Sequence, residues 1–466
     1  MRNKLQKAGL IMTGVFAGVL ISLNFSASAD KAAQAPLPVE ELRAFADVFN
    51  AIKQGYVEPV EDKKLINHAI SGMLSGLDPH SAYLDAEAYK ELQVGTHGEF
   101  GGLGIEVGME DGFVKVISPI EDTPAHRAGV KAGDLIVKLD ETPVKGMNLN
   151  DAVKRMRGKP KTDITLTIAR KGESKPIVLK LTREVIKVQS VKSKVLEPGY
   201  GYLRVAQFQE NTAPAVVEHL GKLAKGGELK GLVLDLRNDP GGLLHGAVGV
   251  AAAFLPANTL VVSTDGRTED AKREYRAATE DYLRGSREDF LKNLPVEART
   301  LPMVVLVNAG SASASEIVAG ALQDHKRAVV MGTQTFGKGS VQTILPLNSS
   351  TAIKLTTARY YTPSGRSIQA KGIEPDIVVE ESANGSSRRL READLDRHLG
   401  NDKDPDAERK SAQPAPQPGA EGGKAPADED DAASPHRFEF AGKDDYQLGQ
   451  AVNLLKGLQI VQNKKP

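Results

Sequence analysis

Three short, almost wholly apolar runs, separated by stretches that suit helices, constrain the fold of this chain more than any other feature. They are GLVLDLR (231–237), LPMVVLVN (301–308) and RAVVMGT (327–333). Such runs are typical of strands that are buried on both faces of a parallel sheet. The stretches between and before them have the length and periodicity of helices. The alternation predicts an α/β layered domain over residues 184–382.

A different pattern precedes this region. Four short runs of β type, FVKVISP, DLIVKLD, DITLTIAR and KPIVLKL, lie between residues 113 and 181. The segment 123–134 suits a short helix and the segment 147–158 a longer one. Residues 95–183 are therefore expected to form a separate β-rich domain with two helices. The fold class predicted for the whole chain is α/β multidomain.

The segment 30–94 is expected to be helical. Apolar residues recur at helical spacing in its first part, where they are Leu42, Phe45, Val48, Phe49 and Ile52. A second helix is expected over residues 65–77. The pair Asp78-Pro79 then indicates a turn that leads into a further short helix.

The C-terminal part changes composition twice. Residues 383–440 are rich in Asp, Glu, Lys, Pro, Gly and Ala, which predicts a disordered acidic and Pro-rich linker. Residues 441–466 are expected to form a C-terminal helix, because Leu448, Val452, Leu455 and Leu458 follow helical spacing. This helix could close its own domain or pack against a second copy of the chain, and the sequence leaves both open.

The N-terminal 29 residues have the pattern of a secretory signal peptide. A basic start with Arg2, Lys4 and Lys7 precedes an apolar stretch, and Ala27 and Ala29 suit cleavage after Ala29. An uncleaved membrane anchor is the alternative. The chain has no cysteine, so an exported form cannot use disulfides, which suits a bacterial periplasm. The net charge of zero gives no indication of a nucleic-acid-binding surface.

The stretch NAGSASASE (308–316) joins the second apolar run to a helix. A serine at such a turn could act as a nucleophile, because unpaired N–H groups at the helix start can stabilise an anion. The S-x-x-E spacing of Ser313 and Glu316 is also that of a capping box, and spacing alone favours the cap. His245 and His325 could accept a proton, but no flanking pattern distinguishes either of them.

Lysine is the other possible proton acceptor. Lys338 stands between two glycines in QTFGKGSVQ, and Gln342 would point to the same side of an extended strand. The amine can act as a base only if burial or nearby positive charge lowers its pKa. A surface lysine in a glycine-rich hairpin is the alternative, and these residues alone do not decide.

The motifs together resemble the carboxyl-terminal processing peptidases, or tail-specific proteases, of the CtpA and Prc type. The resemblance covers residues 40–380 and includes GSASASE, TFGKGSVQ, LVLDLRNDPGG, DPHSAYLDAEAY and TPSGRSIQAKGIEPDI. It implies a periplasmic serine endopeptidase without a metal, a cofactor or a catalytic histidine. It also implies that Ser313 is the nucleophile, Lys338 the base and Gln342 the orienting residue.

Further roles follow from the same resemblance. The oxyanion hole would combine the N–H of Ala314 with that of Gly241 or Gly242, and Gly242 is favoured. A Pro-Gly turn without a chemical role is the alternative for these glycines. Ser311 and Ser315 are expected to shape the turn and not to attack.

Residues 95–183 resemble a PDZ domain, which binds a protein C-terminus as an added strand. Backbone N–H groups of Gly102, Leu103 and Gly104 would hold the terminal carboxylate. The domain could gate the active site or recruit substrates.

Two alternative functions and three predicted partners complete the expectations. A non-cleaving scaffold and a PDZ-bearing trypsin-like protease are the alternatives to the peptidase. The predicted partners are protein substrates with exposed C-termini, a second copy bound through the terminal helices, and a helical-repeat adaptor protein.

Overall fold

The structure is a computed structural model that describes residues 38–120, 122–285, 288–381, 390–404, 440–442 and 444–463. The chain divides into two compact units, residues 1–69 and 70–466. The predicted signal peptide, residues 1–29, lies outside the described residues. None of the described helices is both long and apolar enough to cross a membrane.

The first unit contains helix α2 (Val39–Gly55) and the first half of helix α3 (Asp62–Ser75). The helical spacing in the sequence therefore predicted α2 correctly. Its apolar side is exposed, and no residue of α2 is buried. Leu42, Phe45 and Val48 are 50%, 46% and 59% exposed.

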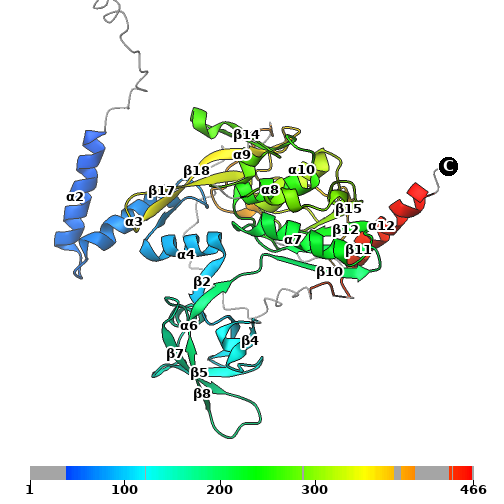
Figure 1. Cartoon of the computed structure of the whole chain (residues 1–466). Helices are drawn as coiled ribbons and strands as arrows, with labels where there is room; N and C mark the ends of the chain where they lie inside the picture. The colour runs from blue at the N-terminus through cyan, green and yellow to red at the C-terminus, as the bar shows by residue number, and fades with distance from the viewer. Residues whose placement is uncertain are drawn as a thin grey trace, which may run out of the picture. The chain divides into compact units, whose positions relative to one another are not determined.

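A six-stranded sheet forms the centre of the second unit (Figure 1). Its strands, in spatial order, are β10 (Val191–Glu197), β11 (Tyr200–Val205), β12 (Gly231–Asp235), β15 (Met303–Val307), β16 (Val329–Gly332) and β19 (Ile377–Val378). All neighbours are parallel except β10 and β11. The three apolar runs form the adjacent strands β12, β15 and β16, as predicted for an α/β layered core.

Helices cover both faces of this sheet. On one face α7 (Thr212–Lys225), α8 (Leu244–Phe254) and α10 (Ala314–Asp324) pack on side chains such as Leu234 and Val305. On the other face α12 (Tyr446–Asn463) packs on Val233 and Val304 through Leu448, Val452 and Leu455. The C-terminal helix thus closes its own domain, one of the two arrangements that the sequence left open.

The loop that follows β16 leads into a strand of a second sheet. Its strands are β1 (Ala82–Leu84), β18 (Ala352–Tyr361), β13 (Leu260–Gly266) and β14 (Arg273–Arg276), and β17 (Ser340–Pro346) pairs with β18. The sequence did not predict β1, because a strand of three residues is too short to show a periodicity. Through β1, the chain after Asp78-Pro79 pairs with residues 352–354.

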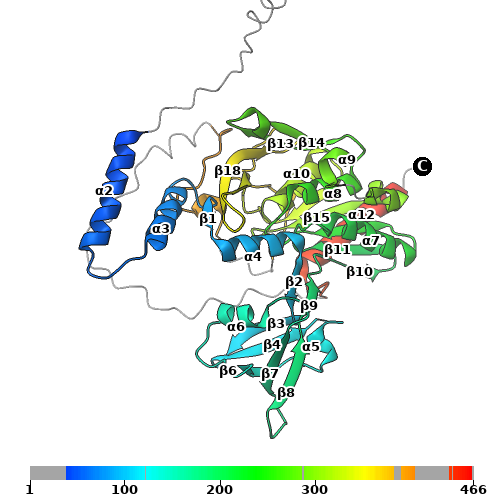
Figure 2. The ribbon, with the colours of Figure 1, turned by 60° about the vertical axis from the view of Figure 1, so that its left-hand side comes forward.

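The β-rich domain contains the predicted runs as a sheet of its own (Figure 2). The strands are β3 (Ile105–Glu110), β4 (Phe113–Pro119), β5 (Leu135–Leu139), β6 (Thr142–Pro143), β7 (Asp163–Ala169) and β8 (Ile177–Thr182). Helices α5 (Pro124–Arg127) and α6 (Leu149–Met156) are the two that were expected. A separate ribbon of β2 (Glu99–Gly102) and β9 (Glu184–Lys187) flanks the domain in sequence, and α4 (Ala86–His97) precedes it.

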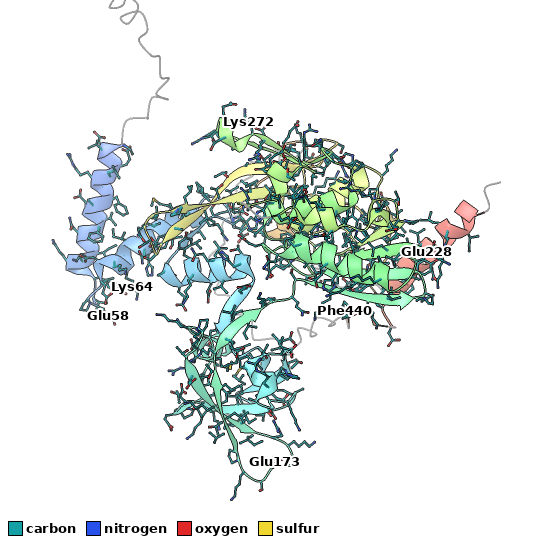
Figure 3. All side chains as sticks on the ribbon, viewed as in Figure 1. Glu58, Lys64, Glu173, Glu228, Lys272 and Phe440 are labelled. Atoms are coloured by element: carbon teal, nitrogen blue, oxygen red, sulfur yellow. The ribbon has the colours of Figure 1, made fainter. Side chains whose placement is uncertain are left out.

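One part of the predicted linker 383–440 differs from the prediction. Residues 390–404 contact the core and include the 3₁₀ helix η4 (Glu392–Asp394). Their polar side chains find backbone partners, as where Asn401 donates to the Gln369 carbonyl and Arg391 to the Thr335 carbonyl. Composition predicted disorder, because it counts apolar side chains and not such hydrogen bonds. Phe440, which ends the range and is labelled in Figure 3, makes an edge-on ring contact with Tyr202.

Candidate active site

The turn between β15 and α10 holds Ser313 in a strained conformation. Its φ of 54° and ψ of −110° lie in a region that residues other than glycine rarely adopt. Strain of this kind persists only where surrounding contacts enforce it. Ser311 Oγ donates to the Leu236 carbonyl at 2.7 Å, and Ser315 Oγ to the Asp239 carbonyl at 2.9 Å. Both serines thus tie the turn to the loop after β12, as expected of residues that shape it.

Glu316 does more than cap the helix. Its buried carboxylate accepts hydrogen bonds from the Ser313 N–H at 2.7 Å and the Lys338 N–H at 2.9 Å. It also accepts from the Gly337 N–H and the Thr335 hydroxyl. Burial raises the pKa of Glu316 to about 7, and these hydrogen bonds oppose the rise. One side chain therefore joins the serine turn to the lysine loop, which spacing within a single segment could not indicate.

The Lys338 side chain is half-buried, and its amine lies beside Gln342. Its Nζ donates to the Gln342 Oε1 and, at 3.0 Å, to the Ser340 carbonyl. Burial lowers the pKa of Lys338 to about 8. The negative charges of Glu392, Glu316 and Asp78 oppose this shift, and Lys354 adds to it. The amine thus has the environment required of a general base near neutral pH.

A chain of hydrogen bonds continues behind Gln342. Its amide Nε2 donates to the Thr356 hydroxyl at 3.1 Å, and that hydroxyl donates to Asp78 Oδ1 at 3.1 Å. Asp78 also accepts from the backbone and hydroxyl of Ser81. The DPHS motif (78–81), for which the sequence indicated a turn and a family resemblance but no contact with the lysine, therefore holds the partner of the lysine in place.

The glycine loop after β12 approaches the serine turn closely. A Cβ atom on Gly241 would lie 2.9 Å from the Ala314 nitrogen, and one on Gly242 would lie 2.0 Å from the Phe208 carbonyl oxygen. The Gly241 N–H already donates to Asp239 Oδ1 at 2.8 Å. Within the described part of the chain, no hydrogen bond uses the N–H of Gly242 or of Ala314. Of the three predicted donors, these two are therefore available.

The hydroxyl and the amine are not joined directly. Across the described residues, no hydrogen bond links Ser313 Oγ to Lys338 Nζ. The Tyr360 phenol lies near the serine, and interaction with Ser313 lowers the Tyr360 pKa against a larger rise from burial. Catalytic hydrogen bonds often tighten only when substrate binds.

The two histidines considered as proton acceptors lie at helix ends. His325, at the C-terminal end of α10, bonds through Nε2 to the Leu260 carbonyl, and His245 lies in the first turn of α8.

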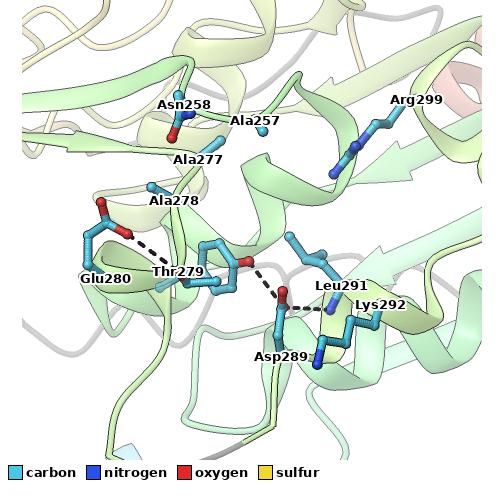
Figure 4. A pocket seen from close by; sticks show the side chains of 11 residues that line it. Ala257, Asn258, Ala277, Ala278, Thr279, Glu280, Asp289, Leu291, Lys292 and Arg299 are labelled. Carbon is cyan, nitrogen blue, oxygen red and sulfur yellow. Dashed lines mark hydrogen bonds between the residues drawn. The ribbon is translucent and has the colours of Figure 1, made fainter.

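A pocket of about 390 Å³ lies elsewhere on the core, beside Tyr282 and Arg299 (Figure 4). There the Tyr282 hydroxyl and the Leu291 N–H both donate to Asp289 Oδ1. None of the predicted site residues lines this pocket. This pocket is therefore separate from the group of residues around Ser313, which we describe by its hydrogen bonds.

The glycine loop of the β-rich domain is held by the end of β4 and the start of α5. The carbonyl of Leu103 accepts from the Ala125 N–H, and that of Gly104 from the Ile120 N–H. Gly104 has a φ of +75°, and a Cβ atom there would overlap Thr123. Within the described ranges, no hydrogen bond uses the N–H of Leu103 or of Gly104. Those two groups, unlike the carbonyls, can still receive a ligand.

Comparison with known proteins decides the family. The model of peptidase family S41 matches residues 199–379, that of a PDZ domain residues 101–181, and that of the activating protease CtpB N-terminal domain residues 17–88. A carboxy-terminal-processing protease of Bartonella bacilliformis is 46% identical over 90% of this chain and 89% of its own length. The chain belongs to the carboxy-terminal processing proteases of peptidase family S41.

Two further proteins to which the chain is similar have related names. Carboxy-terminal processing protease CtpB of Bacillus subtilis is 34% identical over 79% of this chain and 75% of its own length. A solved structure named photosystem II D1 C-terminal processing protease covers 73% of this chain and 93% of its own, with 32% identity and a TM-score of 0.41. The prediction of a CtpA/Prc-type serine peptidase with an internal PDZ domain is confirmed.

Proposed function

We propose that this S41 peptidase is a periplasmic endopeptidase in which Ser313 is the nucleophile, Lys338 the general base and Gln342 the residue that orients the base. The observation that carries the proposal is the half-buried Lys338, whose amine bonds to an amide and a carbonyl and, within the described residues, to no carboxylate. A lysine in this setting loses its proton far more easily than a solvated lysine does.

The proposed reaction proceeds through an acyl-enzyme. Neutral Lys338 takes the proton of the Ser313 hydroxyl as the serine oxygen attacks the scissile carbonyl carbon. The negative charge on the carbonyl oxygen is stabilised by the N–H groups of Ala314 and Gly242. When the tetrahedral intermediate collapses, the C–N bond breaks and Lys338 returns the proton to the leaving amine. Water then attacks the ester as Lys338 accepts its proton, the C–O bond to Ser313 breaks, and Lys338 returns the proton to the serine oxygen.

Cleavage of a denatured casein-like substrate tests the assignment. Ser313→Ala and Lys338→Ala should each lower kcat by at least about 10³-fold, and Gln342→Ala should lower it by a smaller factor. Lys371→Ala, which removes an exposed lysine of the same domain, is the matched control. Activity that survives in Lys338→Ala would favour a triad with a histidine, and intact protein without any cleavage would favour the scaffold.

We propose that the PDZ domain binds the C-terminal carboxylate of substrates at Gly102, Leu103 and Gly104. The unused N–H groups of Leu103 and Gly104 support this role. Deleting residues 95–183 separates the two possible functions of the domain. Faster, unselective cleavage of casein would indicate a gate, and loss of cleavage would indicate a recruiter or an activator.

Location and assembly are proposed from the terminal segments. The signal-peptide pattern of residues 1–29 supports export to the periplasm, and mass spectrometry of the mature N-terminus would detect cleavage after Ala29. The exposed apolar side of α2 supports self-association through that helix. Replacing Leu42 and Val48 together by Asp should then reduce the molar mass measured by light scattering. A helical-repeat adaptor protein is proposed as a further partner on family resemblance.

A further inference from the structure

A second buried carboxylate lies beside the lysine loop, and it comes from the segment 390–404. Glu392 is fully buried, and its backbone N–H donates to the Phe336 carbonyl at 3.1 Å. The neighbouring Arg391 donates to the Thr335 carbonyl at 3.2 Å. These bonds fix the segment to the residues just before Lys338, although more than fifty positions separate the two in sequence.

The side chain of Glu392 is equally constrained. Its oxygens bond to His80 Nε2 at 2.8 and 3.0 Å, and one of them accepts from Gln369 Nε2 at 2.9 Å. The other end of the same Gln369 amide accepts from the N–H of Gly339, at 3.0 Å. The Glu392 carboxylate is thus held by the Gln369 amide, which also binds the Gly339 N–H next to Lys338. It is held as well by the imidazole of His80.

Charge couples Glu392 to the amine. The charged groups that face Lys338 are Glu316 from α10, Asp78 from the turn before β1, Lys354 from β18, and Glu392. After burial, Glu392 exerts the largest influence on the Lys338 pKa, and it raises that pKa. The hydrogen bonds from His80 and Gln369 keep the pKa of Glu392 below its usual value, so the carboxylate is ionised at neutral pH.

We propose that Glu392 is a positioning residue of the active site, which acts on the Lys338 amine through its negative charge and favours the protonated form of that amine. This inference rests on the proposed role of Lys338 as the base. It assigns to the segment 390–404 the task of restraining the base, in addition to covering the loop. Removing the charge, with the shape kept, should therefore make the amine easier to deprotonate.

The experiment is an NMR titration of the full chain in the Ser313→Ala background, with ¹³C at the lysine ε-carbons. The Lys338 signal is assigned by its loss in Lys338→Ala. Glu392→Gln should lower the titration midpoint of Lys338 by about half to one pH unit, a three- to tenfold change in the neutral fraction below the midpoint. Glu392→Asp retains the charge and should keep the midpoint near that of the parent. Asp396→Asn, which removes an exposed charge from the same segment, should also leave it unchanged.

The outcomes separate this inference from the proposed mechanism. An unchanged or raised midpoint in Glu392→Gln would overturn the role of Glu392, and equal shifts in Glu392→Gln and Glu392→Asp would do the same, since they would indicate packing and not charge. The pH profile of kcat/KM, measured with Ser313 restored, addresses the base. If the NMR midpoint falls and the acid limb of the profile does not follow, Glu392 acts on the lysine as inferred, but Lys338 is not the base.

Discussion

At the scale of single residues, the environment of Lys338 predicts how activity depends on pH. Burial lowers the pKa of the amine to about 8, so the neutral form is the minority below that pH and dominates above it. The ratio kcat/KM should therefore rise about tenfold per pH unit below pH 8 and level off above it. A series of buffers at constant ionic strength measures this. A flat profile from pH 5 to 9 would exclude the lysine as the titrating base.

Gly241 and Gly242 give a steric prediction at the same scale. Ala at either position adds a Cβ atom within 3 Å of the Ser313 turn or of Phe208, at a positive φ. Displacing an oxyanion donor should reduce kcat about 10²- to 10³-fold with a smaller effect on KM. Gly365→Ala is the matched control, because Gly365 has a φ of +80° and open space around it. Equal losses in all three variants would point to backbone strain alone.

Asp239 predicts a pH-dependent stability. Its carboxyl is buried, Oδ2 has no hydrogen-bond partner within the described residues, and burial raises its pKa to about 8. The folded pKa lies above the unfolded value of 3.8. The contribution of protonated Asp239 to the free energy of unfolding is therefore fully present below about pH 4 and is lost as the pH rises through 8. Asp239→Asn should therefore gain stability relative to wild type over this range, by a few kcal/mol at most. Urea unfolding at pH 4 and pH 8.5 compares the two. A constant difference would show that Asp239 titrates normally.

At the scale of elements, the sequence predicted those helices and strands whose own pattern of apolar residues indicates that they are buried. Strands β12, β15 and β16 read as continuous apolar runs, α7 as an amphipathic stretch, and α8, α10 and α12 as stretches of helical length or spacing. Strand β1 and helix η4 have three residues each and depend on partners distant in sequence, β18 and the lysine loop. No local pattern could indicate such elements, because their stability comes from the partner.

Helix α12 gives the prediction that belongs to this scale. Leu455 is fully buried against the sheet, whereas Ile460 on the same helix is 56% exposed. Leu455→Ala should lower the free energy of unfolding by about 2–5 kcal/mol, and Ile460→Ala by less than about 0.5 kcal/mol. Denaturant unfolding of both variants measures this. Similar effects would mean that the helix is bound elsewhere than on its own sheet.

At the scale of the whole molecule, the site is assembled from five separate segments. These are the DPHS motif, the glycine loop after β12, the serine turn, the lysine loop and the segment 390–404. The sequence indicated Ser313, Lys338 and Gln342 because their motifs are local and specific to the family. It did not indicate that Glu316 joins two of the segments, that Asp78 lies behind Gln342, or that Glu392 lies beside the lysine loop. Those contacts exist only once the chain has folded.

The central claim is that the amine of Lys338 removes the proton of the Ser313 hydroxyl. The most direct measurement is the rate at which a fluorophosphonate labels Ser313, followed by mass spectrometry of the intact chain and of its Ser313 peptide. The wild type should be labelled at Ser313, and Lys338→Met, which keeps the length of the side chain without the amine, should react at least about 10²-fold more slowly. Labelling of Lys338→Met at the wild-type rate would contradict the account.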